Sequence, residues 1–139
     1  MKNFLAISAV VIVLLIGGVW WSKSMQSSDL TIVSRNGLHW HPELKIFIKG
    51  EEIKIPENKG IETLPHSPIH THDDLPIIHL EFEGLVREDN IRLDRWFEVW
   101  GKDMNSFGQN MRMTVNGAEN TEYGNYLMQD KDQIELRYE

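Results

Sequence analysis

Apolar and polar residues divide the chain into two parts. Residues 4–21 form an uncharged run of 18 residues, which Lys2 precedes and Lys23 follows. As a helix this run spans about 27 Å, close to the hydrocarbon thickness of a bilayer. Trp20 and Trp21 at its end are typical of a membrane–water interface. The pattern predicts a transmembrane helix, and a cleaved signal peptide is the alternative, although no clear Ala-x-Ala site follows the run.

Residues 29–139 are predicted to form one domain, and residues 1–28 supply the anchor or signal peptide and a short tether. The basic N-terminus favours an orientation that places this domain outside the cytoplasm. We therefore expect a single-pass membrane protein with an extracytoplasmic domain, or a secreted protein if the N-terminal segment is cleaved.

Within the domain, period-two alternation of apolar residues predicts strands. Residues 38–49 are expected to form one strand, which turns at Gly50-Glu51 into a returning strand that ends before Pro56. Residues 77–82 are predicted to be a central strand with Ile78, Leu80 and Phe82 on its core face. The segment between these strands, residues 57–76, lacks such a pattern and is predicted to be a long irregular loop.

One helix is predicted in the second half of the domain. Its apolar residues recur at intervals of three and four, and Gly101 marks its end; they are Leu93, Trp96, Phe97 and Trp100. This aromatic face is expected to cover a sheet.

Two more strands are predicted after this helix, at residues 111–115 and 134–138. Asn116-Gly117 is a strong turn signal after the first of them. A single helix covers only one face of a sheet. The fold class predicted is therefore α+β, a small mixed sheet with one covering helix.

Charge and composition exclude several classes of protein. Cysteine is absent, which excludes disulfides, thiolate zinc sites, iron–sulfur clusters and a cysteine nucleophile. All 21 acidic residues and 12 of the 14 basic ones lie beyond residue 28, so the domain carries nine more acidic than basic side chains. Nucleic-acid binding is not expected, because phosphate recognition requires clustered Lys and Arg.

Five of the six histidines form a pattern that predicts a metal site. They are His39, His41, His70, His72 and His79. Two pairs have His-x-His spacing, which on an extended strand puts both rings on one side about 6–7 Å apart along the chain. Three nearby carboxylates could complete the site or orient an imidazole; they are Asp73, Asp74 and Glu81. The alternative is that the histidines are structural or sense pH, and for the isolated His66 an ordinary surface role is expected.

The predicted strands suggest where these ligands lie. His79 is expected on the central strand, opposite its core face, and His39 and His41 near an edge of the same sheet. Pro42 indicates an edge position or a bulge there. His70 and His72 are expected on the proline-bracketed loop, so the sheet would supply the rigidity of the site.

Imidazole and carboxylate donors suit copper or zinc, with non-haem iron a weaker fit. We therefore expect a transition-metal-binding domain for metal capture, delivery or structural stabilisation. An accessory subunit of a membrane or surface assembly, which would bind a protein partner, is an alternative. A small metal-dependent enzyme is another, with Glu81 as a base. The sequence contains no His-Glu-x-x-His helix, nucleophile elbow or phosphate-binding glycine loop.

Several segments resemble a family of small exported or membrane-anchored microbial proteins of uncharacterised function. The segments that carry the resemblance are residues 39–46, 55–56, 68–73, 77–81, 95–101 and 115–117. This resemblance implies an exported domain with a site at the five histidines, and it implies no reaction. In addition, residues 130–134 before the last strand resemble the end of a β-grasp domain, a fold that the predicted hairpin–helix–strand order also suits.

Overall fold

The structure is a computed structural model that describes the backbone of residues 2–25 and 31–139. It divides into two compact units, Met1–Leu30 and Thr31–Glu139. Within the first unit, side chains are described for residue 8 and residues 10–21. Residues 22–25 of the tether predicted over residues 22–28 belong to a helix, whereas residues 26–28, and residues 29 and 30 of the segment predicted to follow, lie outside the described residues.

The first unit contains helix α1, Lys2–Met25. Its large apolar side chains from Val10 to Trp21 are exposed. Among the residues that the structure describes, no helix is both long and apolar enough to cross a membrane. Part of the predicted transmembrane run lies outside the described side chains, and membrane attachment stays a prediction.

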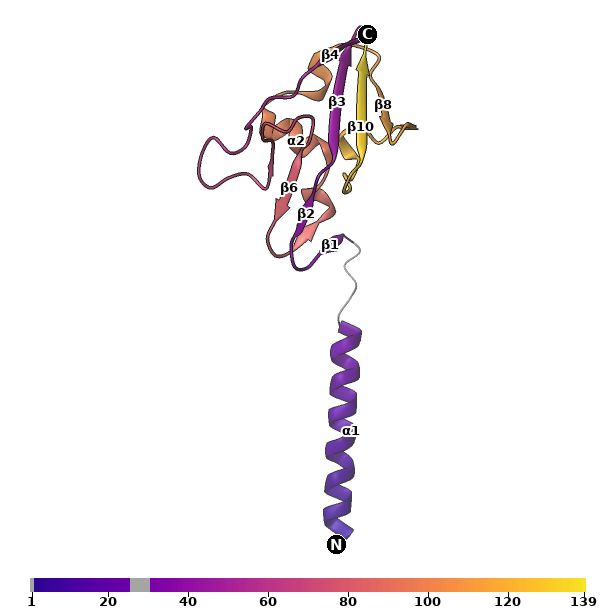
Figure 1. Cartoon of the computed structure of the whole chain (residues 1–139). Helices are drawn as coiled ribbons and strands as arrows, with labels where there is room; N and C mark the ends of the chain where they lie inside the picture. Colours follow the sequence, from indigo (N-terminus) through magenta and orange to yellow (C-terminus); the bar gives the residue numbers. More distant parts are fainter. Residues whose placement is uncertain (1, 26–30) are drawn as a thin grey trace. The chain divides into compact units, whose positions relative to one another are not determined.

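The second unit is built on a mixed five-stranded sheet. Its strands are β3 (Glu43–Ile48), β4 (Glu51–Ile53), β8 (Arg112–Val115), β9 (Ala118–Asn120) and β10 (Gln133–Tyr138). They lie in the order β4-β3-β10-β8-β9. The central pair β3 and β10 is parallel, with Leu44 opposite Ile134 and Ile46 opposite Leu136, and the other pairs are antiparallel. Figure 1 shows β3 and β10 side by side.

Tight turns close the two hairpins of this sheet. Asn116 and Gly117 have φ angles of 52° and 81°, as a two-residue turn of this sequence requires, so the predicted turn is confirmed. The other hairpin turns at Lys49-Gly50, with φ angles of 51° and 88°. This is one residue earlier than the predicted turn, because Glu51 already pairs with Ile48.

Helix α2, Leu93–Trp100, confirms the predicted helix. Gly101 adopts a left-handed conformation with φ 74° and caps its C-terminus, as glycine commonly does. Trp96 and Phe97 are buried in one hydrophobic cluster with residues of the five-stranded sheet, such as Leu136. Because the cluster also includes Leu80, a single core connects α2 with two sheets.

Two smaller sheets complete the unit. A three-stranded antiparallel sheet has the order β2-β6-β5, with β2 at Leu38–Trp40, β5 at Ile69–His70 and β6 at His79–Phe82. Strands β1 (Ile32–Ser34) and β7 (Val86–Arg87) form a two-stranded sheet. Short 3₁₀ helices lie at Glu88–Asn90 (η1), Met104–Phe107 (η2) and Tyr123–Asn125 (η3). The α+β class is therefore correct, but the expectation of one sheet is wrong.

The predicted single strand over residues 38–49 is also wrong. It breaks at His41-Pro42 into β2 and β3, which belong to different sheets. Proline has no N–H to donate and favours such an irregularity. The backbone here crosses to another segment, since Ile78 N donates to Pro42 O and Leu44 N donates to Pro76 O. Figure 1 shows β2 leading into β3 at this break.

The loop predicted over residues 57–76 contains strand β5, which is a correction to the expected irregular segment. Ile69 and His70 pair with Leu80 and His79 of β6. The chain before β5 is fixed by backbone hydrogen bonds, including Ser67 N to Gly60 O and Thr71 N to Lys59 O. His70 is therefore part of a sheet rather than of a free loop.

Candidate metal-binding site

The three-stranded sheet has one apolar face and one histidine face. Leu38, Trp40, Ile69 and Leu80 belong to the hydrophobic core or pack against it. The alternate residues point the other way, and the register pairs His39 with Glu81 and His70 with His79. We call this side, together with His41 and His72 just beyond the strand ends, the histidine face.

The five predicted histidines form two triads that share one member. The outer triad is His39, His41 and His79, and the inner triad is His70, His72 and His79. In each triad one ligand atom per residue lies within 4.8 Å of the others. Rings of the outer triad have centroids 4.7 Å (His39–His41) and 4.9 Å (His41–His79) apart. Histidine triads in this structure therefore lie close enough to hold a metal ion.

The inner triad is as compact as the outer one. Ring centroids are 4.9 Å apart for His70–His72 and 4.7 Å apart for His72–His79. His70 and His79 stack at 5.5 Å with only 10° between their planes. Side-by-side packing of neutral or charged imidazoles offers little stability in itself, whereas three converging nitrogens are the donor set of many divalent-metal sites.

His79 is at the centre of both triads. It is 8% exposed, and its Nε2 lies 3.1 Å and 3.2 Å from the two carboxylate oxygens of Asp74. Its Nδ1 is buried and has no hydrogen-bond partner among the described residues. A carboxylate at Nε2 favours the tautomer with its proton on that nitrogen, which leaves the Nδ1 lone pair free for a metal.

Asp74 is correspondingly held in its charged form. Burial by itself would raise its pKa, but the hydrogen bond from His79 and the nearby imidazoles outweigh burial, so the pKa of Asp74 lies below its ordinary value. An ionised Asp74 orients the His79 ring and increases its basicity as a ligand.

Glu81 lies between the two triads. Its Oε1 is 3.0 Å from His39 Nε2 and 3.8 Å from His79 Nδ1, and its Oε2 is 3.9 Å from His70 Nε2. Glu81 therefore offers a carboxylate to an ion at either triad. Among the predicted carboxylates, Asp74 and Glu81 are placed at the site, whereas Asp73 is exposed and forms no hydrogen bond or ion pair with any described residue.

His70 is prepared for ligation by its surroundings. Its Nδ1 lies 3.0 Å from the carbonyl oxygen of Ser67, and donation from Nδ1 leaves Nε2 free. Burial lowers the pKa of His70 below its ordinary value, more than the Ser67 hydrogen bond and the charge of Glu81 raise it. The neutral imidazole, which is the form that binds metals, is therefore favoured.

Two supporting contacts were not predicted. The backbone N–H of His41 donates to Asp130 Oδ1 at 2.9 Å, and His41 Nδ1 lies 3.8 Å from the same oxygen. Asp130 is 89 residues away along the chain, and no sequence signal indicated this contact. Ser67 could have been suspected only from its position three residues before His70.

The remaining candidate donors lie elsewhere. His66 is exposed and belongs to neither triad, as expected for an isolated histidine. Met104, Met113 and Met128 are buried in the hydrophobic core, so their thioethers pack among apolar side chains. The predicted placement of His79 on the side opposite the core residues of β6 agrees with its contacts to other imidazoles.

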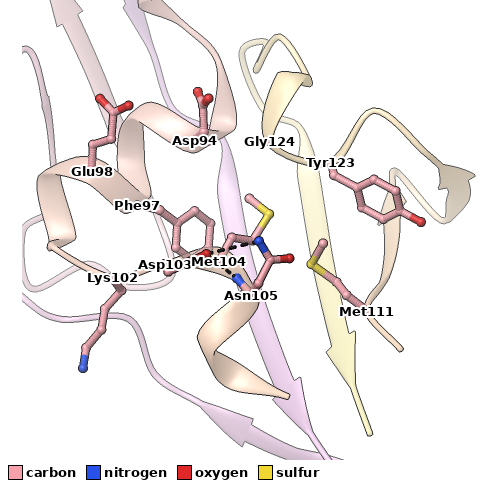
Figure 2. A pocket seen from close by; sticks show the side chains of 10 residues that line it. All are labelled: Asp94, Phe97, Glu98, Lys102, Asp103, Met104, Asn105, Met111, Tyr123 and Gly124. Carbon is pink, nitrogen blue, oxygen red and sulfur yellow. Dashed lines mark hydrogen bonds between the residues drawn. The ribbon is translucent and has the colours of Figure 1, made fainter. Parts of the chain in front are cut away.

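A cavity beside helix α2 is lined by none of the five histidines. It has a volume of about 470 Å³ and is lined mainly by residues of α2, η2 and η3, together with Met111 just before β8. In Figure 2 the carboxylates of Asp94 and Glu98 point away from Met104 and Met111, which line the same cavity. The chemistry that suits a metal ion is therefore concentrated on the histidine face and not in this cavity.

In comparisons with known protein families, with characterised proteins and with solved structures, no match to the chain is found. The resemblance to small exported microbial proteins accordingly stays a prediction.

Proposed function

We propose that the Thr31–Glu139 unit binds a transition-metal ion, copper or zinc, on its histidine face, and that it captures or delivers this ion. The observation that carries the proposal is the pair of triads around His79, whose buried Nδ1 has no hydrogen-bond partner among the described residues. A buried polar atom without a partner is costly, and a bound metal would supply that partner.

Nitrogen donors from imidazole support copper or zinc over calcium or magnesium, which prefer oxygen ligands. Non-haem iron is a weaker fit, because its common sites combine two histidines with one carboxylate and leave positions open. The chain has no cysteine to offer a soft thiolate alternative.

Capture or delivery is favoured over a purely structural role. The unit has a continuous hydrophobic cluster of fifteen buried residues, which reaches the apolar face of the three-stranded sheet. Zinc-dependent small domains lack such a core and fold only with their metal. The ion on the histidine face would therefore be cargo on a domain that is already folded.

Two further parts of the proposal rest on other support. A β-grasp-like fold is supported by the strand order β4-β3-β10-β8-β9, two hairpins flanking a parallel central pair with a helix between them. Membrane attachment through residues 4–21, with the metal-binding unit outside the cytoplasm, is supported by the uncharged run and its flanking lysines.

The test is equilibrium dialysis of the metal-free, full-length chain against Zn²⁺ and, separately, Cu²⁺. We expect one ion per chain in the wild type and in the control His66→Gln. His79→Gln should lower the affinity by roughly 100-fold or more, since loss of an orienting group alone costs about 10- to 100-fold. Absence of stoichiometric binding by the wild type, or unchanged affinity in His79→Gln, would contradict the proposal.

A further inference from the structure

We infer that the histidine face holds a single ion in two overlapping positions, and that the ion passes between the outer and inner triads while it stays bound to His79 Nδ1. This inference rests on the proposed function and adds the route by which the ion is loaded and released.

The first step concerns the nitrogen that the triads share. Asp74 occupies the Nε2 side of His79, at 3.1 Å and 3.2 Å, so Nδ1 is the nitrogen left for a metal. One lone pair binds one ion. The two triads therefore cannot each hold an ion with three histidines at the same time, because each would bind its ion through this Nδ1.

The second step concerns Glu81, which lies beside ligands of both triads. Its carboxylate is within 4.0 Å of His39 Nε2, His79 Nδ1 and His70 Nε2, at 3.0, 3.8 and 3.9 Å. Because its two oxygens face different triads, Glu81 can compensate the charge of an ion at either position. An ion that exchanges one histidine pair for the other thus keeps both His79 and a neighbouring carboxylate.

The third step concerns access from solvent. The side chains of the outer pair, His39 and His41, are 63% and 39% exposed. In the inner pair, the side chain of His70 is only 6% exposed and His72 is half-buried. An ion arriving from solvent meets the outer triad first. The inner triad shields the ion from competing ligands, so it favours retention and the outer triad favours exchange.

The fourth step concerns rigidity. The inner pair flanks Thr71, which is fully buried and donates to Pro56 O at 2.7 Å while it accepts from Lys59 N at 3.1 Å. His70 is further fixed by pairing with His79 and by Ser67. The inner triad is therefore held in place for binding, a requirement for a tight site.

Stopped-flow measurement of zinc loading and release, with a chromophoric zinc chelator as the competing probe, tests this route on the full-length chain. The variants are His39→Gln with His41→Gln for the outer pair, and His70→Gln with His72→Gln for the inner pair. Glutamine keeps most of the side-chain bulk, so neither variant opens a cavity over His79. His66→Gln is the control, and circular dichroism checks the fold of each variant.

We expect one zinc ion per chain in the wild type and in both double variants. Without the outer pair, loading and release should slow by at least about tenfold, because the remaining position is less exposed to solvent than the outer one. Without the inner pair, binding should weaken and release should become faster than in the wild type.

Three results would overturn the inference: two ions per wild-type chain, complete loss of binding in either double variant, or an unchanged loading rate without the outer pair. Complete loss in either double variant would mean that all five histidines form one site. These outcomes differ from failure of the proposed function, in which the wild type itself binds no ion.

Discussion

The five-stranded and three-stranded sheets share one core, but their outward faces differ in chemistry. On the five-stranded sheet, Lys45 lies opposite Glu135, and the Arg137 guanidinium lies 4.3 Å from the centre of the Phe47 ring. These outward groups compensate one another, as is common on solvated sheets. On the three-stranded sheet, His70 lies opposite His79, and both are buried.

This difference shows which sheet supports the fold and which carries the chemistry. Opposite charges across strands contribute a little stability and need no further explanation. Paired imidazoles do not stabilise the sheet when a buried ring nitrogen has no hydrogen-bond partner among the described residues, so their arrangement is better explained by a ligand. Substitutions in the two sheets should therefore separate stability from metal affinity.

The largest expected effect on stability comes from the core of the five-stranded sheet. Leu136→Ala removes a fully buried side chain and should lower the free energy of unfolding by about 2–5 kcal/mol. Lys45→Ala, on the exposed face of the same sheet, should change it by less than about 0.5 kcal/mol. Urea denaturation measures both, and similar losses in the two variants would contradict the assignment of faces.

The second effect separates affinity from stability on the histidine face. The double variant His39→Gln, His41→Gln removes the outer pair. In the metal-free chain, each of the two substitutions should change the free energy of unfolding by less than about 0.5 kcal/mol, because both residues are substantially exposed. In contrast, zinc at a concentration of 100 times its Kd should raise the free energy of unfolding of the wild-type chain by about 2.7 kcal/mol. Thermal melting with and without zinc measures both quantities. An absence of zinc stabilisation in the wild type would remove the distinction between the two sheets.

The third effect concerns orientation of the shared ligand. Asp74→Asn should weaken zinc binding about 10- to 100-fold, because the amide cannot hold the His79 Nε2 proton as a carboxylate does. Asp73→Asn, at the exposed neighbouring position, should leave the affinity unchanged. Competition with a chelator of known affinity measures both variants. Equal affinities would show that Asp74 does not position His79.

The smallest effect lies at the end of the five-stranded sheet. The Tyr138 hydroxyl donates to the Met104 carbonyl oxygen at 2.7 Å, and burial, together with the charge of Asp103, raises its pKa above the ordinary value. The neutral phenol is therefore favoured in the folded state. Its contribution to stability is complete below the unfolded pKa of about 10 and declines as the pH rises above it.

Tyr138→Phe should accordingly cost about 1 kcal/mol at pH 7 and reduce the loss of stability between neutral and alkaline pH. Unfolding by urea at pH 7 and above pH 10 measures this difference. An equal alkaline loss in the variant and the wild type would mean that another group is responsible.

The parts of this fold that could be predicted from sequence are those with local signals. Helix α2 follows from the spacing of Trp96 and Phe97 and from Gly101, and β10 follows from alternation that ends at Tyr138. The break at Pro42 was only partly foreseen. Strand β5 was missed because it is two residues long and exists through its pairing with β6, which no local pattern encodes.

The same limit applies to the site. His-x-His spacing identified the five histidines, because imidazoles two residues apart share one side of an extended chain. Their division into two triads around His79 depends on the register of three strands. The contact of His41 with Asp130 depends on the loop before β10, where Asp132 accepts hydrogen bonds from Tyr126 and Gln129. Contacts between residues so far apart in the sequence are set by the tertiary fold and are not visible in any local sequence pattern.

X-ray absorption spectroscopy of the zinc-loaded, full-length chain tests the central claim most directly, because it reports the atoms around the ion. We expect one ion with a first shell at about 2.0–2.1 Å and outer-shell scattering from three imidazoles, which His79→Gln should reduce. A stoichiometric ion without imidazole scattering, or no stoichiometric ion at all, would contradict binding on the histidine face.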